Sequence, residues 1–167
     1  YEMRKRLFGE TRDHEDVAHS LHNLGLSYSN LNQPEKSLEY HLKLYEMRKR
    51  LFGETRDHVD VALTLYNIGV SYENLGQHEK SLEYDLKSYE MRKRLFGKIR
   101  DHADIAQSLY NLGISYSKLN QHEKALEFKL KAYEMRKRLF GETSDHEDVA
   151  DSLYAIGSSY SKLNHPK

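Results

Sequence analysis

The sequence contains no cysteine and no tryptophan, only two prolines, and no excess of charge of either sign. Without cysteine the chain has no disulfide, thiol nucleophile or cysteine-ligated metal site, and a reducing compartment is mildly favoured. Lys+Arg and Asp+Glu both number 26, whereas a nucleic-acid-binding chain usually carries a basic excess. We therefore expect no nucleic-acid partner, and we expect a cytoplasmic location.

Long hydrophobic runs are also missing. The mean hydropathy is −0.87, and no apolar run approaches the roughly 18 residues of a membrane span. The opening residues, YEMRKR, lack the apolar core of a signal peptide, so we expect neither a membrane partner nor a secretion signal. The 167 residues suffice for one ordinary domain with a core of its own.

A stretch of nine residues, YEMRKRLFG, occurs four times without any change. Residues 1–44 and 45–88 align without gaps and match at 33 of 44 positions, so the repeat extends well beyond these nine residues. A fixed period of roughly 20–50 residues indicates a solenoid of stacked units rather than a globular enzyme. The four copies are Tyr1–Gly9, Tyr45–Gly53, Tyr89–Gly97 and Tyr133–Gly141.

The first part of each unit has the apolar spacing of an α-helix. Its apolar and small residues step by one, three, three, one, three and three, which places them on one side of a helix. In the first unit they are Val17, Ala18, Leu21, Leu24, Gly25, Tyr28 and Leu31. We expect the N-caps at Asp13, Asp57, Asp101 and Asp145, and first-turn acids at Asp16, Asp60, Asp104 and Asp148. The left-handed C-caps are expected at Asn32, Gly76 and Asn120.

A second helix follows at once in each unit. Pro34 suits its first turn, and Gly53, Gly97 and Gly141 stand where it should end. The nine constant residues then form the last half of this helix and its glycine cap. We expect the RKR triplet to be solvated, with its charges opposing the negative end of the helix dipole.

Each first helix also carries a glycine in its interior, where glycine costs about 1 kcal/mol relative to alanine. The four are Gly25, Gly69, Gly113 and Gly157. A cost repeated in every unit indicates close approach of a partner helix. The small residues Ser37, Ser81 and Ala125 of the second helices are expected to face these glycines.

These residues resemble the tetratricopeptide repeat. Its pattern of a large apolar residue, Leu-Gly and an aromatic matches Leu65, Ile68-Gly69 and Tyr72, and its small residue early in the second helix matches Ser81. The longer form found in kinesin light chains and nephrocystin-type proteins is more similar still, through the link GETRDHVDVA and the helix LYNIGVSY. The resemblance implies an all-α, right-handed superhelical solenoid of antiparallel helix pairs, with a concave groove lined by the first helices.

The resemblance covers the whole chain, with two kinds of departure. The proline expected after each link histidine is missing, and the aromatic expected midway along the second helix is His41, Asp85 or Lys129. We expect one array over residues 1–167. Its parts are the end of a preceding second helix (1–9), three helix pairs (10–53, 54–97 and 98–141), and a lone first helix (142–167).

The sequence offers little for catalysis or metal binding. One histidine recurs in each link, and copies a repeat width apart lie too far from one another to share a metal. We expect these histidines to serve the start of each first helix: His14, His58, His102 and His146. No glycine-rich phosphate loop or serine nucleophile elbow is present, so we expect no enzyme, no metal and no cofactor.

A binding surface is the remaining place for function. In tetratricopeptide repeats, one face of each first helix lines the groove, and in kinesin-light-chain-type repeats asparagines on it are expected to hold a peptide backbone. An amide offers both a donor and an acceptor, which suits a backbone of any sequence. The matching positions here are Asn23, Asn67 and Asn111, then Leu26, Val70 and Ile114, then Asn30, Asn74 and Lys118, with Tyr66, Tyr110 and Tyr154 beside them.

These residues predict a non-catalytic scaffold for a protein or peptide ligand. A clamp for a C-terminal carboxylate needs lysine where this chain has His22, Tyr66 and Tyr110, so an internal segment fits better. The row of asparagines is also consistent with a relic of duplication. Two other hypotheses stay open: head-to-tail self-association through open repeat ends, and a sensor region of a larger nucleotide-dependent signalling protein.

Overall fold

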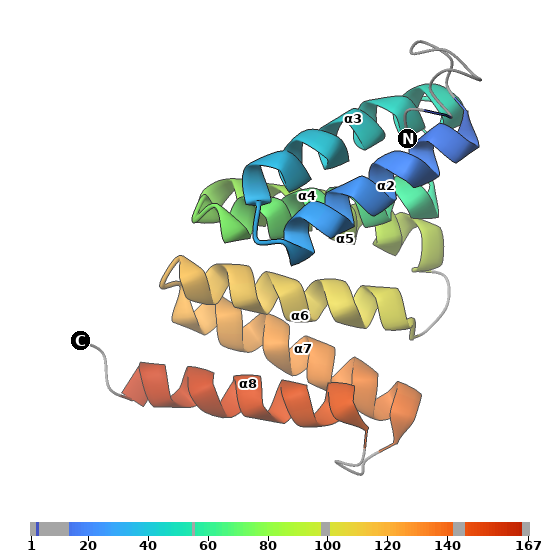
Figure 1. Ribbon diagram of the computed structural model, residues 1–167. Coiled ribbons are helices and arrows are strands. Elements are labelled where there is room, and N and C mark those ends of the chain that lie inside the picture. Colours follow the sequence, from blue (N-terminus) through green and yellow to red (C-terminus); the bar gives the residue numbers. More distant parts are fainter. Residues whose placement is uncertain (1–2, 4–13, 55, 98–100, 142–145, 165–167) are drawn as a thin grey trace. The chain divides into compact units, whose positions relative to one another are not determined.

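A computed structural model of the chain describes residue 3 and residues 14–54, 56–97, 101–141 and 146–164. The regular structure in these residues is entirely helical (Figure 1). The helices are α2 (Glu15–Asn30), α3 (Pro34–Phe52), α4 (Val59–Asn74), α5 (His78–Phe96), α6 (Ala103–Lys118), α7 (His122–Phe140) and α8 (Glu147–Asn164). The predicted all-α repeat fold is confirmed. The expected helical end at residues 1–9 lies outside the described residues, apart from Met3.

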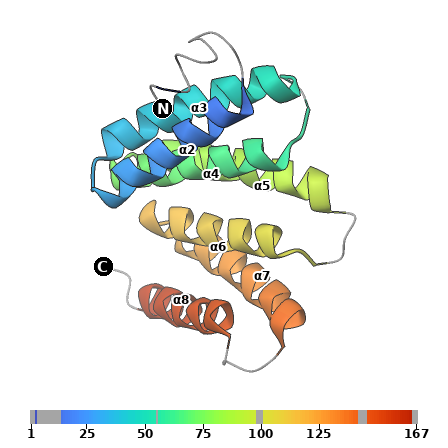
Figure 2. The same ribbon diagram turned by 45° about the vertical axis from the view of Figure 1, so that its right-hand side comes forward.

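The chain divides into two compact units, an N-terminal unit of residues 1–84 and a C-terminal unit of residues 85–167. In the N-terminal unit α3 packs against both α2 and α4. In the C-terminal unit α7 packs in the same way against α6 and α8 (Figure 2). Both α3 and α7 therefore join two first helices. The expected superhelical hand and the expected repeat boundaries stay predictions.

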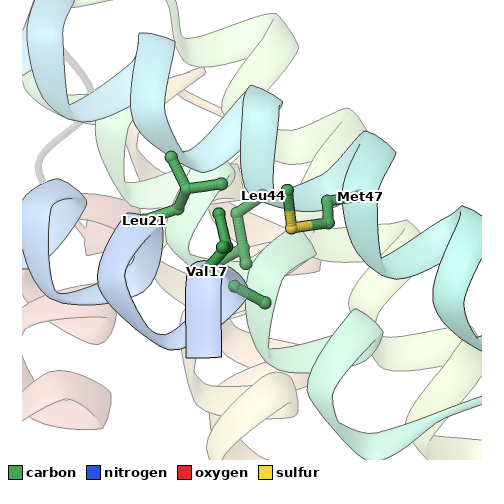
Figure 3. Packing of buried hydrophobic residues seen from close by; sticks show 5 residues of the cluster. Val17, Leu21, Leu44 and Met47 are labelled. Carbon is green, nitrogen blue, oxygen red and sulfur yellow. The ribbon is translucent and has the colours of Figure 1, made fainter. Parts of the chain in front are cut away.

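The apolar core of the N-terminal unit is the seam between α2 and α3. Val17 and Leu21 of α2 lie against Leu44 and Met47 of α3, with Ala18 beside them (Figure 3). The stacked rings of Tyr28 and Tyr40 and those of the equivalent C-terminal pair continue the seam toward the helix turn. In the C-terminal unit the matching cluster is Ile105, Leu109 and Ala132, with Tyr89, Phe96, Tyr110, Phe128 and Met135 packed against it.

Two of the interior glycines, Gly25 and Gly113, face the middle of a second helix. A Cβ built on Gly25 would lie 2.4 Å from Nε2 of His41, and one on Gly113 would lie 2.5 Å from Cγ of Lys129 and 3.2 Å from the carbonyl oxygen of Ala125. The close approach is thus confirmed. Ala125 faces Gly113 as expected, whereas the atoms nearest to a Cβ on Gly25 all belong to His41, one turn beyond Ser37.

Histidine, rather than aspartate, caps three of the first helices, α2, α4 and α6. The Nδ1 atoms of His14, His58 and His102 accept hydrogen bonds from the backbone N–H two residues on, at 3.1, 3.2 and 3.2 Å. The predicted caps at Asp57 and Asp101 are therefore wrong by one residue, and Asp13 and Asp145 lie outside the described residues. Stacking on a phenylalanine explains why histidine, and not aspartate, occupies the cap. The His58 ring lies on that of Phe52, with centroids 3.6 Å apart, and the later links show the same pairing.

The first helices end as predicted. Asn32, Gly76 and Asn120 take positive φ values of 54°, 70° and 57°. In the first of these turns the Gln33 N–H donates to the Tyr28 carbonyl at 2.9 Å, and the Asn32 N–H donates to the Ser29 carbonyl at 3.0 Å. This pair of bonds is the Schellman arrangement, which satisfies carbonyls left open at a helix end. The short turn that results places the second helix antiparallel to the first.

Two equivalent glycines test the role of close packing. We expect Gly25→Ala to destabilise the chain by about 1–3 kcal/mol, because the new methyl would overlap the His41 ring. Gly157→Ala is the matched control, since a Cβ there meets no atom within 4 Å and replaces a poor helix former. We expect it to stabilise the chain by up to about 1 kcal/mol. Thermal unfolding followed by circular dichroism measures both. Equal effects of the two changes would contradict this account.

Candidate functional site

The predicted binding face of the N-terminal unit lies on α2 and α4. On α2, Asn23, Leu26 and Asn30 are all exposed and present two amides around one leucine. On α4 the predicted residues differ in exposure: Asn67 is only 7% exposed, Tyr66 and Val70 are half-buried, and Asn74 is exposed. The α2 residues are therefore the more accessible part of this face.

In the C-terminal unit the face belongs to α6 and α8. Asn111, Ile114 and Tyr110 are half-buried, whereas Lys118 is exposed. The Oδ1 atom of Asn111 accepts a hydrogen bond from Nε2 of Gln107 at 2.9 Å. On α8 the equivalent tyrosine, Tyr154, is 83% exposed. The face thus combines an accessible aromatic ring, an apolar residue and a cation.

The three asparagines of the predicted row have different surroundings. Asn23 is exposed, whereas the Nδ2 atoms of Asn67 and Asn111 are buried and have no hydrogen-bond partner. Buried amide donors usually find a partner, because an unpaired one costs about 1–3 kcal/mol. The same sequence position therefore offers a solvated amide in α2 and unpaired, enclosed donors in α4 and α6.

One residue of the constant stretch lies beneath this face. Arg48 is buried, and its Nη1 donates to the carbonyl oxygen of Asp60 at 2.8 Å and to Oγ1 of Thr64 at 2.7 Å. Its Nη2 lies 3.6 Å from Oδ1 of the Asp60 carboxylate. The expectation of a fully solvated RKR triplet is wrong for its first arginine. Arg48 continues the apolar spacing of Leu44 and Met47, and that register was the signal that could have revealed its burial.

Arg136 makes the same contacts in the C-terminal unit and adds two to α6. It donates to the Asp148 carbonyl and Ser152 Oγ of α8, and to Oε1 of Gln107 at 2.8 Å. Its guanidinium lies 4.5 Å from the centroid of the Tyr110 ring. This arginine therefore links α6 to α8 directly under a residue of the predicted face. Burial, followed by Asp151, raises the pKa of Tyr110 above its ordinary value.

In the first repeat the tyrosine position is His22. Burial, followed by Arg48, lowers the pKa of His22 below its ordinary value, so the ring is neutral at pH 7. The Nδ1 atom of His22 is buried without a hydrogen-bond partner. The N-terminal unit therefore offers a neutral imidazole where the C-terminal unit offers a phenol.

A second buried polar position differs in residue type from one repeat to the next. It holds His41, Asp85 and Lys129, all of which are buried. Each reaches a serine of the next first helix: His41 Nδ1 lies 3.2 Å from Ser71 Oγ, Asp85 accepts from Ser115, and Lys129 donates to Ser159 at 2.8 Å. Sequence reasoning noted these residues only as departures from an aromatic. A serine hydroxyl can donate or accept, so one partner serves all three.

Family models described as tetratricopeptide repeat match residues 17–60 and residues 60–138, well over half of the chain. The chain belongs to the tetratricopeptide repeat family. No curated protein matches it in sequence. Within the described residues, no group of three or more acidic, histidine or cysteine side chains is placed to hold a metal ion, and no helix is long and apolar enough to cross a membrane.

Several solved structures share the fold at low sequence identity. The apo form of RapI superposes with a TM-score of 0.79 and 21% identity, over 98% of this chain and 56% of RapI. A putative kinesin light chain from Podosopora anserina, with nearly identical TPR-like repeats, gives 0.77 and 14%, over 97% of this chain and 74% of that one. The TPR2AB domain of yeast Sti1, solved as a complex with pHSP90, gives 0.63 and 18%, over 90% and 49%.

Replacing the buried arginine of this tetratricopeptide array should destabilise it far more than replacing the exposed arginine two residues on. We expect Arg48→Met to lower the free energy of unfolding by about 1.5–3 kcal/mol, because charged hydrogen bonds to α4 are lost. Arg50→Met, in the same triplet but exposed, should change it by no more than about 0.5 kcal/mol. Urea titration compares the two. Equal losses would indicate that the charge of the triplet matters rather than the buried contacts.

His41 should make the array sensitive to acid. Burial, then His22 and Arg48, lowers the pKa of His41 from 6.5 to about 4 in the folded chain. The unfolded chain therefore binds the extra proton first, and stability falls as the pH drops from about 6.5 toward 4. We expect His41→Gln to lose less stability than the parent chain between pH 7 and 4.5, by on the order of 2 kcal/mol. Urea titration at both pH values measures this difference, and parallel losses would refute it.

Proposed function

We propose that this array is a non-catalytic protein-interaction scaffold that holds an extended peptide segment of a partner against its first-helix faces. The observation that carries the proposal is the exposed row of Asn23, Leu26 and Asn30 on α2, beside the buried stripe that forms the core. Leu26 follows Asn23 by three residues and Asn30 follows Leu26 by four, so the row runs along one face of the helix. Nothing in the core requires these side chains.

The chemistry of the α2 row suits a peptide backbone. Exposed amides can donate to a carbonyl and accept from an N–H of any sequence. Leu26 between them gives an apolar contact for one side chain of the ligand. In the recognition of extended peptides, backbone hydrogen bonds supply affinity and side-chain contacts supply specificity.

The C-terminal unit favours ligand side chains of a different kind. Tyr154 is almost fully exposed, and tyrosine is frequent among the residues that dominate binding energy. Lys118 adds a cation on the same helix as Ile114. This unit therefore suits a segment with an apolar or aromatic residue and a negative charge.

The solved relatives support a peptide ligand in general terms. The Sti1 domain was solved with pHSP90, so the fold can hold a peptide in that protein. Here His22 and Tyr110 replace the lysines of a terminal-carboxylate clamp, which favours an internal segment. We place the binding event in the cytoplasm, consistent with a chain that has no cysteine.

The structure changes which residues should be altered to test the proposal. Asn67 is buried, so replacing it disturbs packing as well as binding. The exposed pair Asn23 and Leu26 can be replaced without opening the core.

The test is selection of peptides from a random display library on the parent chain. We expect Asn23→Ala with Leu26→Ala to weaken the selected peptides at least tenfold, because both the backbone contact and the apolar contact are removed. Fluorescence anisotropy with synthetic peptides measures this affinity. Glu39→Ala with Lys43→Ala, an exposed ion pair on α3, is the matched control and should have no effect. The proposal that the α2 row binds the peptide would be refuted by peptides whose affinity is unchanged in both double variants. It would also be refuted by peptides that lose affinity equally for both.

A further inference from the structure

Cations of the C-terminal unit gather at one end of its predicted binding face. Lys118 is the last residue of α6, Lys162 holds the same repeat position in α8, and both are exposed. Burial, followed by the charge of Lys162, lowers the pKa of Lys129 on α7, so these two ammonium groups lie near each other. In the N-terminal unit the corresponding positions hold uncharged amides and a histidine, namely Asn30, Asn74 and His41. The positive end is therefore a feature of the C-terminal unit.

The buried charge of Lys129 has only neutral partners. The residue is 5% exposed. Its Nζ donates to Oγ of Ser117 at 3.0 Å, to Oγ of Ser159 at 2.8 Å and to the carbonyl oxygen of Ala155 at 3.3 Å. These bonds use the three donors of the ammonium group but bring no negative charge. A carboxylate that approaches Lys162 is therefore attracted by the buried cation as well.

The opposite end of the same face carries a carboxylate. Asp151 is exposed, and within the described residues no cation is paired with it, whereas Asp148 is paired with Arg136 at 3.1 Å. Burial, followed by Asp151, raises the pKa of Tyr110 on α6, so the carboxylate lies toward that helix. Asp151 therefore borders the predicted face.

The two charged ends have a defined spacing along α8. From Asp151 to Lys162 the steps are three, four and four residues, through Tyr154 and Ser158, which keeps the four side chains on one side of the helix. This length of helix rises about 16 Å. An extended peptide covers the same distance in about five residues. Between the charged ends, Tyr154 and Ile114 of α6 provide an aromatic and an apolar contact.

We propose that the C-terminal unit binds a peptide segment of mixed charge, with an acidic side chain on Lys162 and, about five residues away, a basic side chain on Asp151. An apolar or aromatic side chain between them contacts Tyr154. This inference rests on the proposed function, because it specifies the ligand of the same face. It adds a basic residue and a spacing to that ligand. A segment with charges of one sign only is attracted to one end and repelled by the other.

Coupling between ligand charges and chain charges tests the inference. The probes are peptides selected on the parent chain from the random display library, and versions of them in which the acidic residue is replaced by its amide. At about 50 mM salt, where exposed charges are weakly screened, we expect this replacement to weaken binding to the parent chain about threefold to fivefold. With Lys162→Gln the replacement should have no further effect, whereas with Asp151→Asn it should keep its full effect. Replacing the basic residue by methionine should show the opposite dependence. Fluorescence anisotropy measures each affinity.

Lys131→Gln is the matched control. It removes an exposed lysine of the same unit, paired with Glu127 on α7, and should leave both couplings unchanged. Salt at about 500 mM should reduce both couplings below about twofold, because screening then acts within about 4 Å. Circular dichroism confirms folding, and a variant that fails to fold is replaced by Lys162→Met or Asp151→Ser.

The outcomes separate this inference from the function on which it rests. Peptides that bind the parent chain but show no coupling to Lys162 or Asp151 overturn the inference and leave the scaffold function intact. Equal coupling to Lys162 and Lys131 also overturns it, since that result indicates attraction by net charge rather than pairing at one end. A library that yields no binding peptide overturns the proposed function, and the inference with it.

Discussion

A buried guanidinium joins each second helix to the first helix that follows it. Arg48, Arg92 and Arg136 each donate to a backbone carbonyl twelve residues on and to a hydroxyl sixteen residues on. A buried charge is tolerated only when it is paired and its donors are used. The carbonyls and hydroxyls meet most of this requirement without a second buried charge. Arginine suits the task because its fork carries several donors and stays charged.

This link explains why nine residues are constant across four copies. Both α3 and α7 have to fit two first helices at once, with the methionine on one and the arginine on the other. Phe52 adds a third contact by stacking on the histidine that caps α4. A change at any of these positions disturbs a neighbour that was built from the same repeat. The position of His41, Asp85 and Lys129 can vary because its partner is a serine, whose hydroxyl forms a hydrogen bond with any of the three.

The sequence alone predicted the helices and their ends well, because both depend on local rules. The 3.6-residue spacing and the left-handed turn at Asn32 need no knowledge of distant contacts. The N-caps were misplaced by one residue because aspartate is intrinsically the better cap, whereas stacking on Phe52 selects His58. Arg48 was misread for the same reason, since its environment comes from α4. Exposure along the asparagine row was beyond prediction, because equal positions in α2 and α4 have unequal surroundings.

The arginine link also shapes the predicted binding face above it. Arg136 lies against the Tyr110 ring, so this tyrosine is held from below and can offer a partner only its outer side. In the first repeat Arg48 lies near His22 instead, and its positive charge helps keep that imidazole neutral. Sequence differences between the repeats thus yield two different faces. The N-terminal unit presents amides, a leucine and a neutral ring, whereas the C-terminal unit presents a phenol and a lysine. The two units therefore offer different chemistry to a peptide of the kind we propose, and a segment suited to one is poorly suited to the other.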